Sequence, residues 1–234
     1  MRVFAIAAAF LFSAAAQANE ARTLLDQAVA VAETHKATRY AFTLVYTDLK
    51  APAAKSYTLR FDPRLPEGKR WSLLKPAEEA LTKEERKRLK TLLKANDADD
   101  RLIYERLAPS AKEARLVAED ADTATFVGAV RDKDTPDSLA RAVDMTMVLD
   151  KAGGYLRTIS VKSKAAFKPA PVAKVERMTQ IQSYEPIAPG GPALLRKAES
   201  SAAGEAMFKK FDQHVTMEYR DFERVAPDQV AAGK

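Results

Sequence analysis

The chain contains no cysteine and only two histidines, His35 and His214. Thiolate nucleophiles, disulfides and the usual Cys/His zinc sites are therefore excluded, and we expect neither a metal site nor a cofactor. The sequence also has no G-x-S-x-G nucleophile elbow, and its paired glycines, at 153–154 and 190–191, fall in expected turns and not in a phosphate-binding loop. These absences favour a protein that is not an enzyme. A hydrolase that uses one of the two histidines is kept as an alternative.

Charge of one sign is in only small excess. Lys and Arg total 38 against 32 Asp and Glu among 234 residues, so the formal charge of +6 is spread over many mixed-sign positions. That balance does not indicate a nucleic-acid-binding protein. With 47% hydrophobic and 30% charged residues, the composition is typical of one globular domain whose core is large enough to need no disulfide.

The longest apolar run lies at the N-terminus. Val3–Phe12 follows the positively charged Arg2 and precedes the small-x-small triplet Ala16-Gln17-Ala18. This pattern is typical of a secretory signal peptide, and the run is shorter than the roughly 20 residues of a membrane-spanning helix. We therefore predict a periplasmic protein with a signal peptide at 1–18, a single domain at 19–225 and a flexible tail at 226–234.

Two segments have a helical pattern. Glu20–Thr34 is amphipathic, with an apolar stripe at Leu25, Ala28, Val29 and Ala32. A second helix is expected to begin at Thr82-Lys83-Glu84-Glu85, because a Thr followed three residues later by Glu matches a capping box. Its narrow apolar stripe consists of Leu89, Leu92 and Leu93. Arg101–Leu107 is expected to add a further helical turn.

The remainder alternates between apolar and polar residues, which predicts half-buried strands. Short turns join most of these strands, so an antiparallel meander is favoured, and a sheet of eight to ten strands should curl. The expected fold class is mainly β (α+β), a curved antiparallel sheet or unclosed half-barrel with helices covering the concave side. The expected strands are Tyr40–Tyr46, Ser56–Asp62, Arg70–Leu74, Glu113–Glu119, Thr123–Arg131, Val143–Asp150, Tyr155–Lys164, Lys174–Tyr184, Ala193–Ser201 and His214–Phe222.

The concave face is expected to be rich in aromatic and thioether side chains, which suit an apolar ligand such as a lipid or an acyl chain. The alternative is a solid core packed on the two helices, with no cavity. The candidate ligand-binding residues are Phe42, Leu44, Leu59, Phe61, Trp71, Met145, Met147, Met217 and Tyr219, with Tyr40 and Tyr57 on the same face.

The second helix is strongly basic. Its positive residues, Arg86, Lys87 and Arg88 among them, are candidates for binding an envelope protein or an anionic membrane surface. The alternative is a solvated face, because Glu84 and Glu85 interrupt the charge and the apolar stripe lacks Trp and Phe. Aromatic and basic residues are not interleaved on this helix, so nucleic acid is not an expected partner.

Four polar residues, Asn96, Asp97, Asp99 and Asp100, follow this helix. An EF-hand would need acidic residues alternating over about twelve positions, with a central Gly and a closing Glu. The chain lacks that spacing, so we interpret the cluster as a helix cap.

One stretch resembles periplasmic proteins of Gram-negative bacteria. It comprises Arg60-Phe61-Asp62-Pro63, then Pro66-Glu67-Gly68-Lys69-Arg70-Trp71-Ser72-Leu73-Leu74, and the capped helix that starts at Thr82. The order of elements around it resembles the lipoprotein-carrier superfamily. This resemblance implies an unclosed antiparallel half-barrel with helices over an apolar cavity, and binding of the acyl chains of lipoproteins or other lipids.

Two hypotheses follow. The first is a non-enzymatic periplasmic binding or carrier protein for an apolar ligand, with apolar burial as the driving force. The second is an envelope protein-protein interaction module with a solid core, which contacts its partner through the basic helix or a sheet edge.

Overall fold

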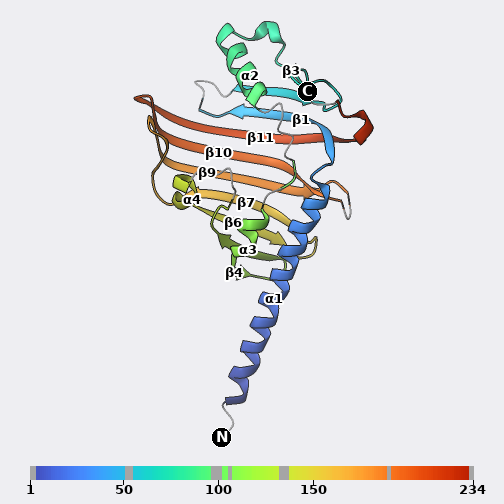
Figure 1. Cartoon of the computed structure of the whole chain (residues 1–234), viewed down its shortest axis with the longest axis vertical. Helices are drawn as coiled ribbons and strands as arrows, with labels where there is room; N and C mark the ends of the chain where they lie inside the picture. Colours follow the sequence, from blue (N-terminus) through green and yellow to red (C-terminus); the bar gives the residue numbers. More distant parts are fainter. Residues whose placement is uncertain are drawn as a thin grey trace.

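The computed structural model describes residues 4–50, 55–95, 102–104, 107–131, 137–188 and 191–231. These residues form one large antiparallel sheet with α-helices beside it, which confirms the predicted fold class (Figure 1). The helices are α1 (Phe4–His35), α2 (Lys83–Ala95), α3 (Ala108–Glu113) and α4 (Asp137–Ala142), with short 3-10 helices η1 (Glu78–Ala80) and η2 (Pro227–Gln229). The strands are β1 (Arg39–Asp48), β2 (Lys55–Phe61), β3 (Trp71–Lys75), β4 (Arg115–Glu119), β5 (Thr123–Gly128), β6 (Val143–Asp150), β7 (Tyr155–Ser163), β8 (Phe167–Ala170), β9 (Ala173–Pro186), β10 (Ala193–Ala206) and β11 (Lys209–Val225).

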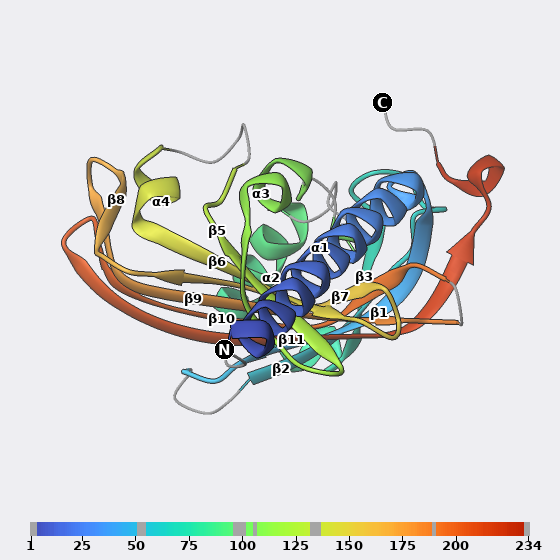
Figure 2. The same cartoon turned by 90° about the horizontal axis from the view of Figure 1, so that it is seen from below.

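The sheet has eleven strands and does not close. Its order is β3-β2-β1-β11-β10-β9-β7-β6-β5-β4, with β8 pairing to β9 beside this path. Figure 2 shows that the sheet is curved and that α1, α3 and α4 lie on its concave side. Curvature is expected because the twist of each strand accumulates across so wide a sheet.

One junction departs from a simple meander. β1 pairs with β11, the last strand, so the N-terminal strands β1–β3 extend the C-terminal edge of the sheet. β3 and β4 follow one another in sequence but form the two opposite edges. The long connection between them, which contains α2 and α3, makes this separation possible.

Helix α1 is continuous from Phe4 to His35 and therefore includes residues 4–18 of the expected signal peptide and the whole of the expected helix at Glu20–Thr34. Its first half extends beyond the sheet, whereas its second half crosses the concave side (Figures 1 and 2). Within the part of the chain that the structure describes, no helix is long and apolar enough to span a membrane.

The capping box of α2 forms as predicted. The Thr82 N–H donates to Glu85 Oε2 at 2.7 Å, and the Glu85 N–H donates to the Thr82 hydroxyl at 3.2 Å. The side chain of Lys55 in β2 also contacts the Glu85 carboxylate. The same glutamate therefore caps the helix and joins it to the sheet.

Several expected boundaries were wrong. Leu102–Tyr104 is not helical, and the turn predicted at Arg101–Leu107 is replaced by α3, which starts at Ala108. α4 and β8 were not predicted. β10 continues past the expected end at Ser201 to Ala206, and β11 begins at Lys209, before the expected start at His214. In β10, pairing with the neighbouring strands overrides the weak β-propensity of Ala and Gly. The cluster at 96–100 lies outside the described residues.

The start of the expected tail at 226–234 contacts the loop between β2 and β3. η2 follows β11 directly, and the Ala231 N–H donates to the carbonyl of Pro63 at 3.1 Å. The Arg70 guanidinium donates to the Ala231 carbonyl at 3.5 Å.

Candidate functional site

Aromatic side chains meet at one end of the concave face. Trp71 in β3, Phe61 in β2 and Phe42 in β1 are direct cross-strand partners. The Phe42 and Phe61 rings are stacked with centroids 5.1 Å apart, and the Trp71 ring lies 4.9 Å from Phe61 and 5.6 Å from Phe42. Tyr219 in β11 contributes a fourth ring, 5.6 Å from Phe42. This aromatic cluster is continuous across four strands.

An apolar row crosses the rest of the face. Consecutive cross-strand partners point to the same side of a sheet, so a row can be followed from one strand to the next. From β4 to β11 this row is Leu116, Phe126, Met147, Ile159, Gln182, Ala198 and Met217. Gln182 is therefore a single polar side chain in the middle of an apolar row.

Helix α1 covers part of this face. Ala21, Leu25, Ala28, Val29 and Ala32 are all at most 6% exposed and belong to the same core as the sheet residues. Three of the five are alanines, whose small side chains allow the helix to lie close to the strands. The apolar stripe predicted from the sequence is thus the surface that packs on the sheet.

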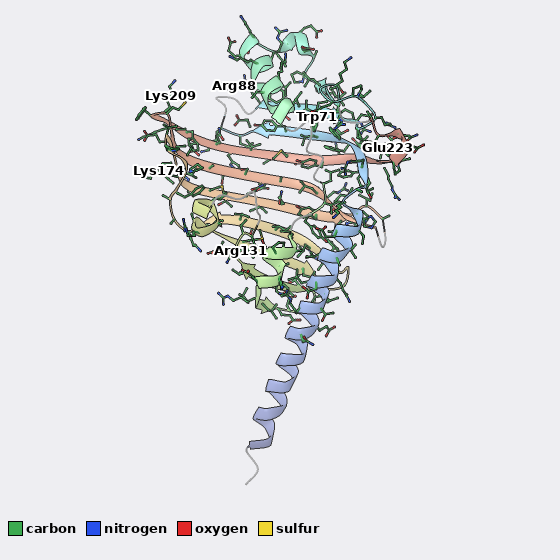
Figure 3. All side chains as sticks on the ribbon, viewed as in Figure 1. Trp71, Arg88, Arg131, Lys174, Lys209 and Glu223 are labelled. Carbon is green, nitrogen blue, oxygen red and sulfur yellow. The ribbon has the colours of Figure 1, made fainter. Side chains whose placement is uncertain are left out.

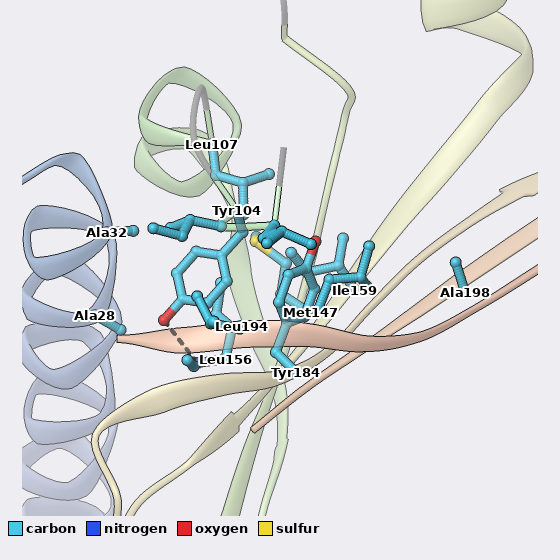
Figure 4. Close-up of a cluster of buried hydrophobic side chains, with 14 of the residues drawn as sticks. Ala28, Ala32, Tyr104, Leu107, Met147, Leu156, Ile159, Tyr184, Leu194 and Ala198 are labelled. Carbon is cyan, nitrogen blue, oxygen red and sulfur yellow. Dashed lines mark hydrogen bonds between the residues drawn. The ribbon is translucent and has the colours of Figure 1, made fainter. Parts of the chain in front are cut away.

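A short non-helical segment, Leu102–Tyr104, forms the second part of the cover, and we call it the plug. All three of its residues are buried. The Leu195 N–H in β10 donates to the Leu102 carbonyl at 2.7 Å, and the Leu156 N–H in β7 donates to the Tyr104 hydroxyl at 3.3 Å. Figure 4 shows the Tyr104 ring inside the buried cluster, with this second bond drawn.

Both hydrogen bonds of the plug are made next to irregularities of strand pairing. The β9–β10 register shifts between Leu195 and Lys197, and the β6–β7 register shifts where Leu149 pairs with Leu156. A β-bulge disrupts the ladder locally and leaves backbone groups without a strand partner. The plug therefore binds where the sheet itself leaves hydrogen-bonding groups available.

Tyr104 of the plug meets a second buried tyrosine, Tyr184 of β9. The rings of Tyr104 and Tyr184 are perpendicular, with centroids 5.1 Å apart, and the Tyr184 hydroxyl donates to Gln182 Oε1 at 3.2 Å. Burial raises the pKa of the Tyr184 phenol, and the neighbouring Tyr219 and Tyr104 raise it further. Burial also raises the pKa of Tyr104. Both phenols are therefore neutral hydrogen-bonding groups around physiological pH.

The nine candidate ligand-binding residues all belong to this core or pack against it, but they do not form one cluster. Phe42, Phe61 and Trp71 lie together, whereas Met145 and Met147 are on β6, across four intervening strands from β1. Sequence reasoning missed Tyr104, because an isolated Tyr in an irregular segment has no periodicity to mark it. It also missed Tyr184 as a site residue, although the strand that contains it was predicted. Six of the nine are buried, namely Phe42, Leu44, Leu59, Phe61, Met145 and Met147. The other three, Trp71, Met217 and Tyr219, are half-buried.

The expected partner-binding residues are on the outer face of α2. Arg86, Lys87 and Arg88 are exposed, whereas Leu89, the next residue, is buried in the core. The helix therefore presents its positive charge to solvent, as its sequence pattern indicates.

An ionic cluster fixes the loop between β2 and β3 to β11. The Arg64 guanidinium lies 2.8 Å from Asp62 and 2.6 Å from Glu223, and Arg60 lies 3.3 Å from Glu223. The hydrogen bonds from Arg64 lower the pKa of Asp62. No group of three or more His, Asp or Glu residues suited to holding a metal ion occurs among the described residues.

Comparison with known proteins finds no match: no protein-family model, curated protein or solved structure is significantly similar to this chain. The class of protein is therefore defined by its architecture, an unclosed curved antiparallel sheet whose apolar concave face is covered by helices and a plug.

Proposed function

We propose that this chain is a non-enzymatic periplasmic binding or carrier protein for an apolar ligand, either a lipid or the acyl chain of a lipoprotein. The observation that carries the proposal is the cover of the concave face. The apolar inner side of an unclosed sheet is covered by helices and by a plug held through two hydrogen bonds.

The ligand would occupy the concave face after the plug moves away. Releasing each hydrogen bond of the plug costs about 1–3 kcal/mol, because a backbone N–H beneath an apolar ligand is left without a partner. An acyl chain gains roughly 25 cal/mol for each Å² of apolar surface withdrawn from water. Burying a few hundred Å² of ligand therefore offsets the two hydrogen bonds, and the acyl chain replaces the apolar contacts that Leu102, Ile103 and Tyr104 give up. Trp71, Phe61, Phe42 and Met147 are the residues proposed to form the wall.

The periplasmic part of the proposal rests on the N-terminal segment. Among the α1 residues whose burial the structure describes, which begin at Asn19, the first that is buried is Ala21, three positions after the expected cleavage site at Ala18. Cleavage there would keep Ala21, Leu25, Ala28, Val29 and Ala32, the buried residues of the described part of α1, in the mature protein. This function is also the one that the resemblance to the lipoprotein-carrier superfamily implies.

Trp71 provides the test, because it is the only tryptophan of the chain and lies within the aromatic cluster. The protein is titrated with a fatty acid brominated along its chain, and Trp71 fluorescence is followed. We expect saturable quenching, and native mass spectrometry of gently purified protein should show bound lipid.

Two variants make this test specific. Tyr104→Phe removes one hydrogen bond of the plug and should increase the apparent affinity, because the closed form becomes less stable. Tyr46→Phe is the matched control, since Tyr46 is half-buried and pairs with Tyr57 away from the plug. Absence of quenching, together with a lipid-free mass, would contradict the proposal.

A second candidate function, an envelope protein-protein interaction module, is favoured because several residues of the proposed ligand-binding wall are completely buried. Phe42, Leu59, Phe61 and Met147 are at most 1% exposed, as expected for the solid core of an interaction module. In that case the basic face of α2 is the contact surface. Charge reversal at Arg86, Lys87 and Arg88 should abolish capture of an envelope partner without lowering stability. Reversal at the exposed Lys112, Arg115 and Lys162 is the matched control.

A further inference from the structure

The turn between β10 and β11 exposes two large apolar side chains. Met207 is 73% exposed and Phe208 is 92% exposed, the two highest values among the large hydrophobic residues that the structure describes. Both lie at the tip of a long hairpin that closes with the pair Ala206 and Lys209. The chain therefore places its most exposed apolar residues at the far end of its longest strands.

The backbone at this tip has a conformation that these residue types rarely adopt. Met207 has a φ of 49° and Phe208 a φ of 62°, so both are in the left-handed region. Two-residue hairpin turns of this type normally contain Asn, Asp or Gly, which tolerate a positive φ. The conformational preferences of this turn thus do not explain why Met and Phe occupy it. This points to a function for the exposed Met207 and Phe208 side chains themselves.

A second hairpin contributes to the same surface. The Met207 N–H donates to the Val172 carbonyl at 2.9 Å, which joins this tip to the turn between β8 and β9. Val172 is itself 60% exposed. Met207, Phe208 and Val172 are therefore exposed apolar residues of two adjoining turns, and we call them the tip.

The tip is fixed to the sheet by close backbone packing. Gly204 in β10 lies so near β9 that an added Cβ would be 2.1 Å from the Lys174 carbonyl oxygen. The pairing of β9 with β10 and of β10 with β11 continues to Ala206. The apolar side chains of the tip are thus presented on a supported platform of paired strands.

Lysines surround the apolar surface. Lys209 and Lys210 follow it directly, and Lys168 and Lys174 belong to the adjoining hairpin; all four are exposed. Figure 3 shows that Lys209 and Lys174 lie at the same end of the sheet. Three acidic residues lie nearby, and each is matched by basic residues. Glu176 lies 3.7 Å from Lys174, and Asp212 lies 3.1 Å from Lys50 and 3.5 Å from Arg177. Glu205 is the cross-strand partner of both Lys174 and Lys210.

We propose that the tip docks onto an anionic lipid bilayer, with Met207, Phe208 and Val172 entering the interfacial region and the lysines contacting head groups. A projecting apolar tip with a basic border complements a membrane surface, where apolar burial and attraction to anionic lipids add together. This surface is separate from the concave face and from α2. The proposal therefore stands or fails independently of ligand binding.

A tryptophan placed at the tip tests the proposal directly. In the full-length Trp71→Phe/Phe208→Trp variant the only tryptophan is at the tip, so its fluorescence reports insertion there and nowhere else. With vesicles of phosphatidylglycerol and brominated phosphatidylcholine we expect a blue shift and quenching. The matched control is Trp71→Phe/Leu74→Trp, because Leu74 is 51% exposed on β3 at the sheet edge and should stay unquenched.

The two components of binding are separable. Replacing Met207 and Val172 by Ser in the reporter variant should lower its vesicle partition coefficient about tenfold or more, because apolar burial is lost. Neutral phosphatidylcholine vesicles, or added salt, should also weaken binding, since the lysines are exposed and screened. No quenching by anionic vesicles, equal quenching by neutral ones, or equal quenching of the control would overturn the proposal. The first result would point to a protein partner instead.

Discussion

The hydroxyl of Tyr104 accepts a hydrogen bond from the Leu156 backbone N–H, at a distance of 3.3 Å and inside the apolar core. The two residues are far apart in sequence, and this contact holds the plug on the sheet at an irregularity of strand pairing. Under the proposed function it links the stability of the fold to the opening of the concave face, because a ligand that enters under the plug would have to break it.

Removing the Tyr104 hydroxyl should therefore destabilise the protein. In Tyr104→Phe the buried Leu156 N–H loses its partner, which typically costs about 1–3 kcal/mol. Urea unfolding followed by circular dichroism measures the loss. Tyr46→Phe should have a much smaller effect, and equal changes in the two variants would show that the hydrogen bond does not hold the plug.

The aromatic cluster should contribute strongly to stability. Phe42→Ala removes a ring that packs against Phe61, Trp71 and Tyr219, and a truncation of this kind costs about 3–5 kcal/mol. Leu74→Ala, at a side chain 51% exposed, should change the free energy of unfolding by less than about 0.5 kcal/mol. A red shift of Trp71 fluorescence in Phe42→Ala alone would confirm that the cluster had opened.

The capping glutamate of α2 should titrate at unusually low pH. Hydrogen bonds from Lys55, then from the backbone and hydroxyl of Thr82, lower the pKa of Glu85 to about 2. Because the folded-state pKa is depressed, this contribution to stability is present above pH 4.5 and is lost as the pH falls toward 2. Carboxyl NMR titration should show that Lys55→Met raises the pKa of Glu85, whereas Lys83→Met leaves it nearly unchanged.

Gly204 should be far less tolerant of substitution than Gly68. An alanine Cβ at Gly204 would clash with the Lys174 carbonyl, whereas at Gly68, where φ is +81°, no atom lies within 4 Å. Gly68→Ala therefore meets only the left-handed backbone penalty of about 1–2 kcal/mol. Thermal unfolding should show a greater loss for Gly204→Ala. A smaller loss there would mean that β9 and β10 can separate locally without cost.

Processing of the N-terminus should leave the core intact. Intact-mass measurement of secreted protein should give a chain that starts at Asn19. Its Tm should match that of the full chain, because it keeps Ala21, Leu25, Ala28, Val29 and Ala32, the α1 residues that the structure describes as buried. A truncation that starts at residue 29 also removes Leu25 and Ala28, so its Tm should fall markedly. Equal Tm values for the two truncations would contradict the packing of α1.

Local patterns identified most of the regular elements. The Thr82 and Glu85 capping box predicted the start of α2, and period-two alternation predicted β1, β2 and β6, because each signal depends on residues a few positions apart. The apolar stripe of α1 likewise predicted which residues pack on the sheet. The weakly patterned β8 and α4 could not be found in this way.

What the sequence alone determined is the strand-rich fold class, the buried aromatic face of β1 and β2, and the position of the capped helix. Only the tertiary structure decided that β1 pairs with β11, that Leu102–Tyr104 fills the concave side, and that Met207 and Phe208 project from the sheet. The reason is physical: periodicity and capping are encoded by neighbouring residues, whereas strand order, plugging and exposure depend on which distant segments reach one another when the whole chain folds.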